Sequence, residues 1–266
     1  MPESGAMVAA AFGIGIGVSL GMLGGGGSIL AVPVLVYALG QPVRDAVPTS
    51  LWVVGGSSLA GALAHLREGM VPWRSALLFG GAGIAGSFGG AWVNHRLDPD
   101  LLLLGFALLM VLSAAAMYRN RPERDELAAA KSCENAWRER PLLVLIVGAG
   151  VGALTGLFGV GGGFILVPAW TLAMGCPVRV SVGASLVVIA LNAGGALVSH
   201  LGFGSVDLSV AVPFTVAAVA GALVGGRLAA RIDTERLERW FAYLVVAVAV
   251  FVITQVFVQE GGQIDV

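Results

Sequence analysis

The amino-acid sequence predicts an all-α polytopic membrane protein made of two inverted-topology repeats, and three observations predict it. Hydrophobic residues make up 57% of the 266 residues and charged residues 12%, whereas soluble domains carry about 25% charged residues. Uncharged runs of about 20 residues, the length of a transmembrane helix, separate the charged clusters. Residues 8–118 also match residues 143–253 without a gap, which indicates an internal duplication.

The repeat defines the domains and their elements. Residues 8–118 form the first transmembrane repeat, residues 119–141 a connecting loop, and residues 142–258 the second repeat. Each repeat holds about five apolar segments, and those of the first repeat are roughly 7–22, 27–39, 46–66, 75–94 and 101–118. The first two are short, because about 13 helical residues cover about 20 Å of a hydrocarbon core of about 30 Å. We expect them to be tilted short helices or a re-entrant hairpin around a glycine-rich break.

The distribution of basic residues predicts the topology. If each repeat crosses the membrane an odd number of times, one side receives Arg67, Arg74, Arg119, Arg121, Arg124, Lys131, Arg138, Arg140, Arg179, Arg227, Arg231, Arg236 and Arg239. The other side then receives Arg44 and Arg96. Four crossings per repeat would leave no such bias. Because Lys and Arg concentrate in cytoplasmic loops, we expect inverted repeats, a cytoplasmic and partly helical loop at 119–141, and both termini outside.

Two glycine runs mark corresponding positions of the repeats. Residues 21–33 read "GMLGGGGSILAVP" and residues 156–168 read "GLFGVGGGFILVP". Inverted-repeat transporters bind their substrates near the midplane, at helices interrupted in matching positions of both halves. A glycine run that begins a helix exposes backbone N–H groups at the positive end of the helix dipole, which favours an anion. The alternative is close helix packing through small residues.

The hydroxyl and amide side chains near these runs extend the candidate site. "PTSLWV" and "GASLVV" begin the third segment of each repeat, so their hydroxyls can reach an anion or simply cap a helix. An intramembrane Asn can bind substrate or bridge two helices. The candidate substrate-binding residues are Gly24, Gly25, Gly26, Gly27, Ser28, Thr49, Ser50, Gly161, Gly162, Gly163, Ser185 and Asn192.

Two repeat-matched pairs are candidates for admitting the substrate or for gating. Arg44 and Arg179 both follow "PV", on opposite sides of the membrane under the expected topology. They can recruit anions to the outer and inner vestibules or extend to the membrane interface from helix ends. His65 and His200 are also matched. Each can be a pH-sensitive gate or proton acceptor, or a helix-end His hydrogen-bonded at the interface.

Other classes of function find little support. The net charge is −1, and no basic patch outside the loops indicates a nucleic-acid partner. Cys133 and Cys176 do not indicate a disulfide framework. We find no paired catalytic carboxylates, no metal cluster and no phosphate-binding loop, and therefore expect no catalytic residues, metal or cofactor, and no enzyme. A Ser–His hydrolase using Ser28 or Ser50 with His65 is an alternative, but nothing in the sequence places these residues together.

The duplicated "GxxGxGGGxxxxP" pattern and the "SL" that follows it resemble the TauE/SafE family of sulfite exporters over residues 8–257. The first copy has Gly25 where the second has Val160, and Ser28 where the second has Gly163. The resemblance implies a multi-pass carrier in the plasma (inner) membrane for small sulfur-containing anions, such as sulfite or sulfoacetate. Its partners would be a small anionic substrate and the lipid bilayer. The oligomeric state stays open, a homodimer included.

The resemblance and the composition together predict a secondary transporter that exports such anions by alternating access between the repeats. Moving one negative charge outward gains about 2.3 kcal/mol per 100 mV of membrane potential. An exporter therefore needs no coupling ion, which agrees with the absence of Asp, Glu and Lys from the apolar segments. A cation-coupled importer or a channel for a sulfur-containing anion is the alternative.

Overall fold

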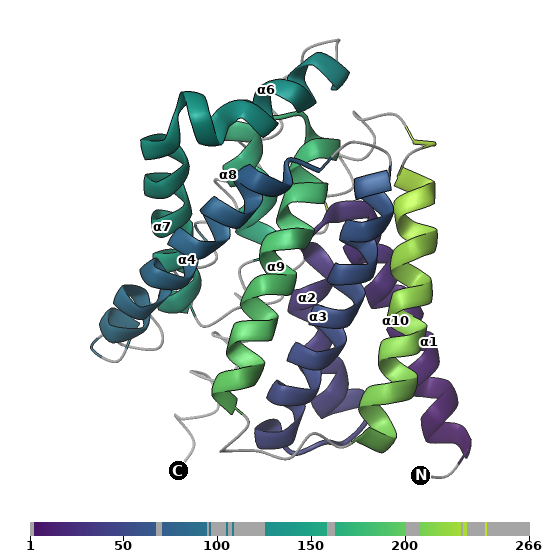
Figure 1. Ribbon diagram of the computed structural model, residues 1–266. Coiled ribbons are helices and arrows are strands. Elements are labelled where there is room, and N and C mark those ends of the chain that lie inside the picture. Colours follow the sequence, from purple (N-terminus) through teal and green to yellow (C-terminus); the bar gives the residue numbers. More distant parts are fainter. Residues whose placement is uncertain are drawn as a thin grey trace.

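The computed structural model describes residues 3–67, 71–94, 96, 105, 108, 126–158, 163–200, 208–229, 231–232 and 243. Its elements are α1 (Glu3–Leu23), α2 (Gly26–Pro33), the π-helix η1 (Val34–Ala38), α3 (Val43–Arg67), α4 (Trp73–Asn94), α6 (Glu126–Glu139), α7 (Pro141–Phe158), α8 (Gly163–Ala173), α9 (Val178–His200) and α10 (Leu208–Ala229) (Figure 1). These residues contain helices and no strand, which confirms the all-helical expectation.

The second apolar segment of each half is short, as the sequence predicts. α2 has 8 residues and α8 has 11. Pro33 ends α2, and a π turn follows in which the Leu39 N–H donates to the Val34 carbonyl at 3.1 Å. Because proline lacks an N–H group and crowds the preceding turn, it favours such a change of helical pitch. The first segment is longer than expected, since α1 begins at Glu3 and has 21 residues.

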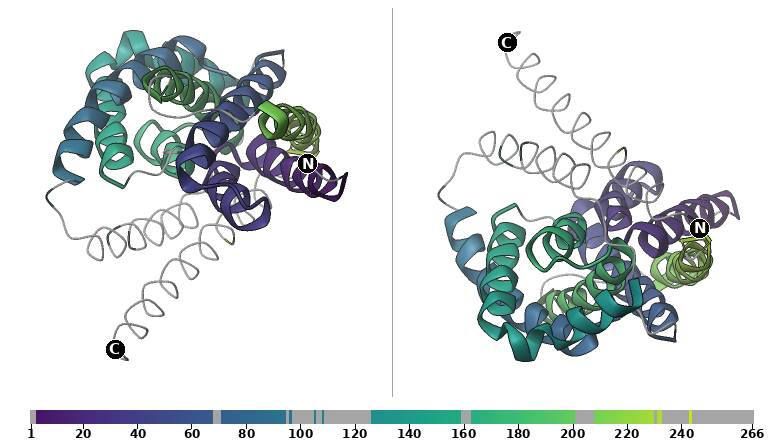
Figure 2. Two further views of the ribbon diagram at one scale, coloured as in Figure 1. Left: turned by 90° about the horizontal axis from the view of Figure 1, so that it is seen from below. Right: turned by 90° about the horizontal axis from the view of Figure 1, so that it is seen from above.

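The long helices pack in pairs that join the two halves of the chain. α1 lies along α10 and α4 lies along α7, side by side in both views of Figure 2. In the first pair Gly17 lies against the Ala218 backbone, and in the second Gly152 lies against the Gly83 backbone. The two contacts are the same contact shifted by 135 residues. In each, a Cβ on the glycine would clash with main chain, so glycine sets how closely the helices approach.

α3 and α9 cross at the centre and run in opposite directions (Figure 1). A Cβ on Gly55 would lie 3.2 Å from the Ala193 Cβ, and one on Gly61 would lie 3.2 Å from a Leu186 methyl group. Residue numbers therefore rise along α3 in the direction in which they fall along α9, so the two helices are antiparallel. α8 packs against α9, and α2 packs against α1 and α3. The two short helices thus lie inside the arrangement of long ones.

Length and composition alone identify two described helices able to cross a membrane, Val178–Leu197 and Leu208–Ala229. The apolar helices Ala9–Leu23 and Pro141–Thr155 are shorter. Core helices of soluble proteins can pass the same test. The outer surface gives better evidence of an apolar environment than helix length does. Phe88, Leu142 and Val216 on it are 74%, 68% and 64% exposed. Large apolar side chains exposed on several helices are typical of a surface that contacts lipid or a partner.

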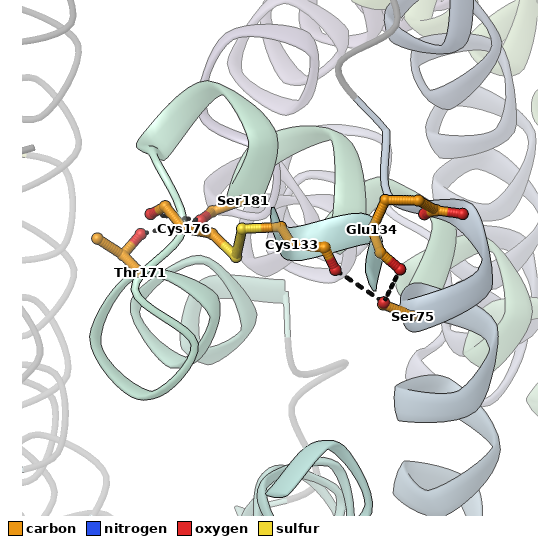
Figure 3. The surroundings of a disulfide bond; sticks show 6 residues. All are labelled: Ser75, Cys133, Glu134, Thr171, Cys176 and Ser181. Carbon is orange, nitrogen blue, oxygen red and sulfur yellow. Dashed lines mark hydrogen bonds between the residues drawn. A yellow bond between two sulfur atoms is a disulfide. The ribbon is translucent and has the colours of Figure 1, made fainter. Parts of the chain in front are cut away.

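Cys133 and Cys176 form a disulfide with their Cα atoms 6.0 Å apart, a single bond that the cysteine count did not predict (Figure 3). The physical reason is the placement of α6, which confirms the expected partly helical connector. The Ser75 hydroxyl on α4 lies 2.8 Å from the Cys133 carbonyl and 2.9 Å from the Glu134 carbonyl. This contact holds Cys133 beside the turn between α8 and α9. The two cysteines are 43 residues apart in the sequence, and that spacing does not indicate that α6 packs against the turn between α8 and α9.

Several helix ends that carry basic residues gather at the same end of the molecule. The end of α3, the start of α4, α6, the start of α9 and the end of α10 all lie at the top of Figure 1. Arg74 Nε at the start of α4 is 4.0 Å from Glu134 Oε1 on α6. Arg179 Nη2 at the start of α9 donates to the Ile232 carbonyl, just after α10, at 2.8 Å. α3 begins at the opposite end, with Arg44 in its first turn.

Candidate functional site

The break between α1 and α2 is built from glycine. Gly24 has a φ of +74°, and its N–H donates to the Leu20 carbonyl at 2.8 Å, which ends α1. Gly25 then turns the chain, and α2 begins at Gly26. The Ser28 N–H donates to the Gly25 carbonyl at 3.2 Å, and the Ser28 hydroxyl donates to the same oxygen at 2.7 Å. The glycine run therefore begins a helix, as the sequence predicts.

The break contacts the second half of the chain directly. Gly25 lies against the backbone of Gly163, the first residue of α8. A Cβ on Gly163 would lie 2.7 Å from the Ser28 Oγ, and a Cβ on Gly24 would lie 2.5 Å from the Ser185 Oγ. Neither glycine has room for a side chain. The structure thus brings Gly24, Gly25 and Ser28 of the first half together with Gly163 and Ser185 of the second, and of these Ser28 and Gly163 are repeat-matched.

Buried hydroxyl groups lie about two turns into α3 and α9, and that of Ser185 lies at the glycine contact. Ser185 is fully buried, and its hydroxyl donates to the Val182 carbonyl at 2.8 Å. Ser50, its repeat-matched residue, is buried on α3. Thr49 is fully buried too, and its hydroxyl has no hydrogen-bond partner among the described residues. Because buried hydroxyls are nearly always hydrogen-bonded, Thr49 is a donor available to a ligand or a water molecule.

The remaining candidates lie elsewhere or outside the described residues. Gly161 and Gly162 are outside them, and Gly26 and Gly27 lie in the first turn of α2. Asn192 lies seven residues beyond Ser185 on α9, which is about 10 Å along a helix. Its side-chain carbonyl is buried and has no partner in the described part of the chain. The structure therefore does not bring Asn192 into the glycine contact.

The two vestibule and gating candidates whose side chains are described, His65 and Arg179, contact other parts of the chain rather than the glycine runs. His65 is buried with Nδ1 3.0 Å from the Gly61 carbonyl, and a Cβ on Gly226 of α10 would lie 3.1 Å from its ring. Arg179 is bound to the Ile232 carbonyl. Arg44 lies in α3 and His200 ends α9, but their side chains are outside the described residues.

Sequence reasoning missed Trp170 of α8. Its side chain is fully buried and its ring centre lies 5.0 Å from that of Phe79 on α4. Its indole N–H has no partner among the described residues. Trp170 fixes the position of the short helix that begins at Gly163. A Trp inside an apolar segment gave no indication of this role, because packing positions are not visible in the hydropathy pattern.

A separate cavity of about 670 Å³ lies between α3 and α9, where Trp52, Leu63, Trp73 and Leu191 are among the lining residues. Among the described residues that line it none is charged, and Thr215 carries the one hydroxyl. An anion transferred into such a cavity would lose its hydration without compensation. The glycine contact is therefore the better candidate for binding an anion.

Comparison with known proteins agrees with a membrane transporter. The family model described as "Sulfite exporter TauE/SafE" matches residues 9–252. A "Probable membrane transporter protein" of Xylella fastidiosa strain 9a5c is 34% identical over 241 residues, covering 90% of this chain and 91% of that protein. A "Probable membrane transporter protein YdhB" of Bacillus subtilis strain 168 is 30% identical over 212 residues, covering 80% and 85%. No solved structure matches the chain.

The family match covers nearly the whole chain, including both glycine runs and all the described helices from α2 to α10. The relatives cover much the same extent and carry the name of membrane transporters. The chain therefore belongs to the TauE/SafE sulfite exporter family of membrane transporters.

Proposed function

We propose that this protein is a secondary transporter of the plasma membrane that exports small sulfur-containing anions, sulfite or an organosulfonate such as sulfoacetate. It works by alternating access between two inverted repeats and catalyses no reaction. The observation that carries the proposal is the contact of Gly24, Gly25 and Ser28 with Gly163 and Ser185. The family description supports the sulfur-containing anion.

The glycine contact suits an anion for electrostatic reasons. α2 and α8 both begin there, at Gly26 and Gly163. The first N–H groups of a helix have no partner within the helix and carry partial positive charge. The Thr49 hydroxyl adds a neutral donor. The Ser28 and Ser185 hydroxyls, which donate to the Gly25 and Val182 carbonyls, can donate to an anion only after turning away from them. Gly161 and Gly162 precede α8 in the sequence. Such a site binds sulfite or sulfonate oxygens without a fixed cation, which favours release as well as binding.

The proposed topology places loop 119–141 in the cytoplasm and both termini outside. The gathering of α6 with the basic ends of α4, α9 and α10 supports it, since Lys and Arg mark the cytoplasmic side. In this arrangement Arg179 lies near the inner vestibule and Arg44 near the outer one. His65 and His200 lie at the far ends of α3 and α9 as gating residues.

The charge distribution supports export rather than coupled import. Acidic residues of the described long helices α1, α3, α4, α7, α9 and α10 are Glu3 and Asp45, both in a first turn. A carboxylate relay for a coupling proton is therefore not available in the middle of these helices. The membrane potential alone drives an anion outward by about 2.3 kcal/mol per elementary charge per 100 mV.

The first experiment is thermal stabilisation of the purified protein by sulfite, thiosulfate, sulfoacetate, taurine, sulfate and acetate at fixed ionic strength. We expect selective stabilisation by sulfite or a sulfonate, which binds the native state only. Ser28→Ala and Ser185→Ala should weaken that stabilisation. Ser87→Ala, on α4 and away from the glycine contact, is the matched control. Equal shifts with all anions would contradict the proposed site.

The second experiment measures sulfite flux in proteoliposomes. We expect efflux that follows the membrane potential and is lost in the Gly161→Ala/Gly162→Ala variant, while its folded yield stays close to that of the wild type. Gly150→Ala is the control, because a Cβ there has nothing within 4 Å. Uptake that depends on a cation gradient would instead indicate an importer, and flux without counterflow a channel. Normal efflux by the double variant would refute the glycine site.

A further inference from the structure

The Cys133–Cys176 bond joins α6 to the turn between α8 and α9, and each of these parts is held by other contacts of its own (Figure 3). Cys133 lies on α6, which the Ser75 hydroxyl of α4 holds by the carbonyls of Cys133 and Glu134. Cys176 lies in the turn between α8 and α9, where its N–H donates to the Trp170 carbonyl at 3.2 Å. The bond therefore ties α8 to the connector and, through it, to α4.

The short helix α8 links this bond to the candidate site. Its first residue, Gly163, contacts Gly25 of the first half, and its last residue, Ala173, lies three residues before Cys176. Its 11 residues span about 16 Å at the helical rise of 1.5 Å per residue. A restraint on the end near Cys176 thus acts on the same rigid element that forms half of the glycine contact.

The turn itself depends on its own hydrogen bonds as well as on the sulfur bridge. Gly175 has a φ of +70°, and the Ser181 hydroxyl donates to the Cys176 carbonyl at 3.3 Å. The Thr171 and Ser181 hydroxyls are 3.1 Å apart, which connects the end of α8 to the start of α9. These bonds keep the turn that carries Cys176 in shape when the disulfide is open, and none of them joins it to α6.

The surroundings of the two cysteines agree with a bond that opens and closes. Their Cα separation of 6.0 Å is in the range for disulfides, so the bond forms without backbone movement. Both residues lie at the end of the molecule that gathers the basic helix ends. Under the proposed topology this end is cytoplasmic, where glutathione keeps most thiols reduced and disulfides are transient or redox-sensing.

We propose that Cys133 and Cys176 form a redox-controlled tether that holds α8 when oxidised and releases it for transport when reduced. This proposal rests on the transport function and topology proposed above. Alternating access requires one part of the protein to move against another. A covalent link from α8 to the connector restrains that movement, so the oxidised protein transports slowly.

The oxidant is a low-molecular-weight disulfide, with glutathione disulfide as the probe. One cysteine thiolate attacks a glutathione sulfur, which forms a mixed disulfide and releases one glutathione thiolate. The second cysteine thiolate then attacks the protein sulfur of the mixed disulfide, which closes the Cys133–Cys176 bond and releases the other glutathione thiolate. Two protein thiols are oxidised, one glutathione disulfide is reduced to two thiols, and the two protons pass to glutathione.

The redox state in cells tests the first half of the proposal. Intact cells are quenched with acid, and free thiols are alkylated before the full-length protein is analysed by mass spectrometry. We expect both cysteines alkylated in growing cells and neither alkylated after treatment with diamide, which oxidises the glutathione pool. A bond that stays closed under both conditions would show a permanent structural disulfide and overturn the switch.

Flux and hydrogen exchange test the second half. Wild-type protein oxidised by glutathione disulfide should lose most of its sulfite flux and regain it after reduction. The Cys133→Ser/Cys176→Ser variant should match the reduced wild type under both conditions. Equal flux from the oxidised and reduced wild type, with bond closure confirmed by mass spectrometry, would overturn the tether.

Hydrogen exchange separates failure of the tether from failure of the proposed cargo. If sulfite is not transported in either state, the cargo proposal fails, but exchange of α8 amides still reports the restraint. We expect slower exchange across residues 163–176 in the oxidised protein than in the reduced one. Unchanged exchange there would refute the tether whatever the cargo is, and the Ser87→Ala variant should behave as the wild type.

Discussion

Replacing Gly24 by Ala tests whether the two halves are held together at the glycine contact. Gly24 has a φ of +74°, a left-handed conformation that costs an L-residue about 1–2 kcal/mol. The new Cβ would lie 2.5 Å from the Ser185 Oγ and 3.0 Å from both the Val167 methyl group and the Val182 Cα. Overpacking of this kind adds about 1–3 kcal/mol. We therefore expect a total destabilisation of about 2–5 kcal/mol.

Gly40→Ala separates the two contributions. Gly40 has a φ of +66° but nothing within 4 Å of its Cβ position, so the variant carries only the conformational cost of about 1–2 kcal/mol. The free energy of unfolding is measured for both variants by SDS titration in mixed micelles. The difference between them, about 1–3 kcal/mol, isolates the contact with the second half.

A second substitution sharpens the assignment. Ser185→Ala removes the nearest of the three clashing atoms, so the Gly24→Ala/Ser185→Ala variant should be less destabilised than the sum of its single variants. Coupling between residues in contact is typically about 0.5–3 kcal/mol. If Gly24→Ala costs no more than Gly40→Ala, or shows no coupling to Ser185, then the packing of the glycine run against α9 is not as described.

Three further predictions concern packing and charge. Gly17→Val should abolish the monodisperse peak of folded protein in size-exclusion chromatography, because Gly17 lies against the Ala218 backbone. Gly15→Val should keep that peak, because a Cβ at Gly15 has nothing within 4 Å. Equal behaviour of the two variants would contradict glycine-mediated packing. Arg179→Ala should lower the free energy of unfolding by about 1–3 kcal/mol, because the Ile232 carbonyl loses a charged donor, and Arg179→Lys should lose less; an unchanged Arg179→Ala protein would argue against that bond. Burial raises the pKa of the Glu134 carboxyl above its ordinary 4.5, while the backbone hydrogen bond and the charge of Arg74 lower it by less. The folded protein therefore favours the neutral form of Glu134. The free energy of unfolding falls as pH rises above 4.5, because the buried carboxyl must then ionise. Thermal unfolding should find Glu134→Gln more stable than the wild type at a pH of about 7 and equal to it below the ordinary pKa of 4.5, and the opposite order would refute the burial argument.

The helical fold was predictable because its signals are local. Uncharged runs identified α3 and α4 within three residues of their observed bounds, and the glycine run with its following proline identified the short α2. The contact between Gly25 and Gly163 was expected in kind from the repeat, since matched interruptions meet at the centre of inverted-repeat folds. The sequence did not reveal that this contact excludes any side chain.

The parts that could not be predicted depend on contacts between distant segments. Cys133 meets Cys176 because Ser75 positions α6, and no local pattern encodes a hydroxyl that bridges to another helix. His65 was a candidate gating residue from its repeat match, yet its position beside Gly226 depends on how α3 packs on α10. Hydropathy reports whether a residue prefers an apolar environment, and it does not report which neighbour supplies that environment.

The pairing of α1 with α10 and of α4 with α7 has a consequence for biosynthesis. α1 is completed at Leu23, but its partner α10 begins at Leu208, so the ribosome must add most of the chain before the helix finds its neighbour. During that interval the backbone at Gly17 and Gly21 has no helix against it. The first half alone therefore cannot assemble, and a chain cut within the connector should recover activity only when both fragments are made in the same cell. The two halves of the chain thus complete each other, because each supplies partner helices for the other.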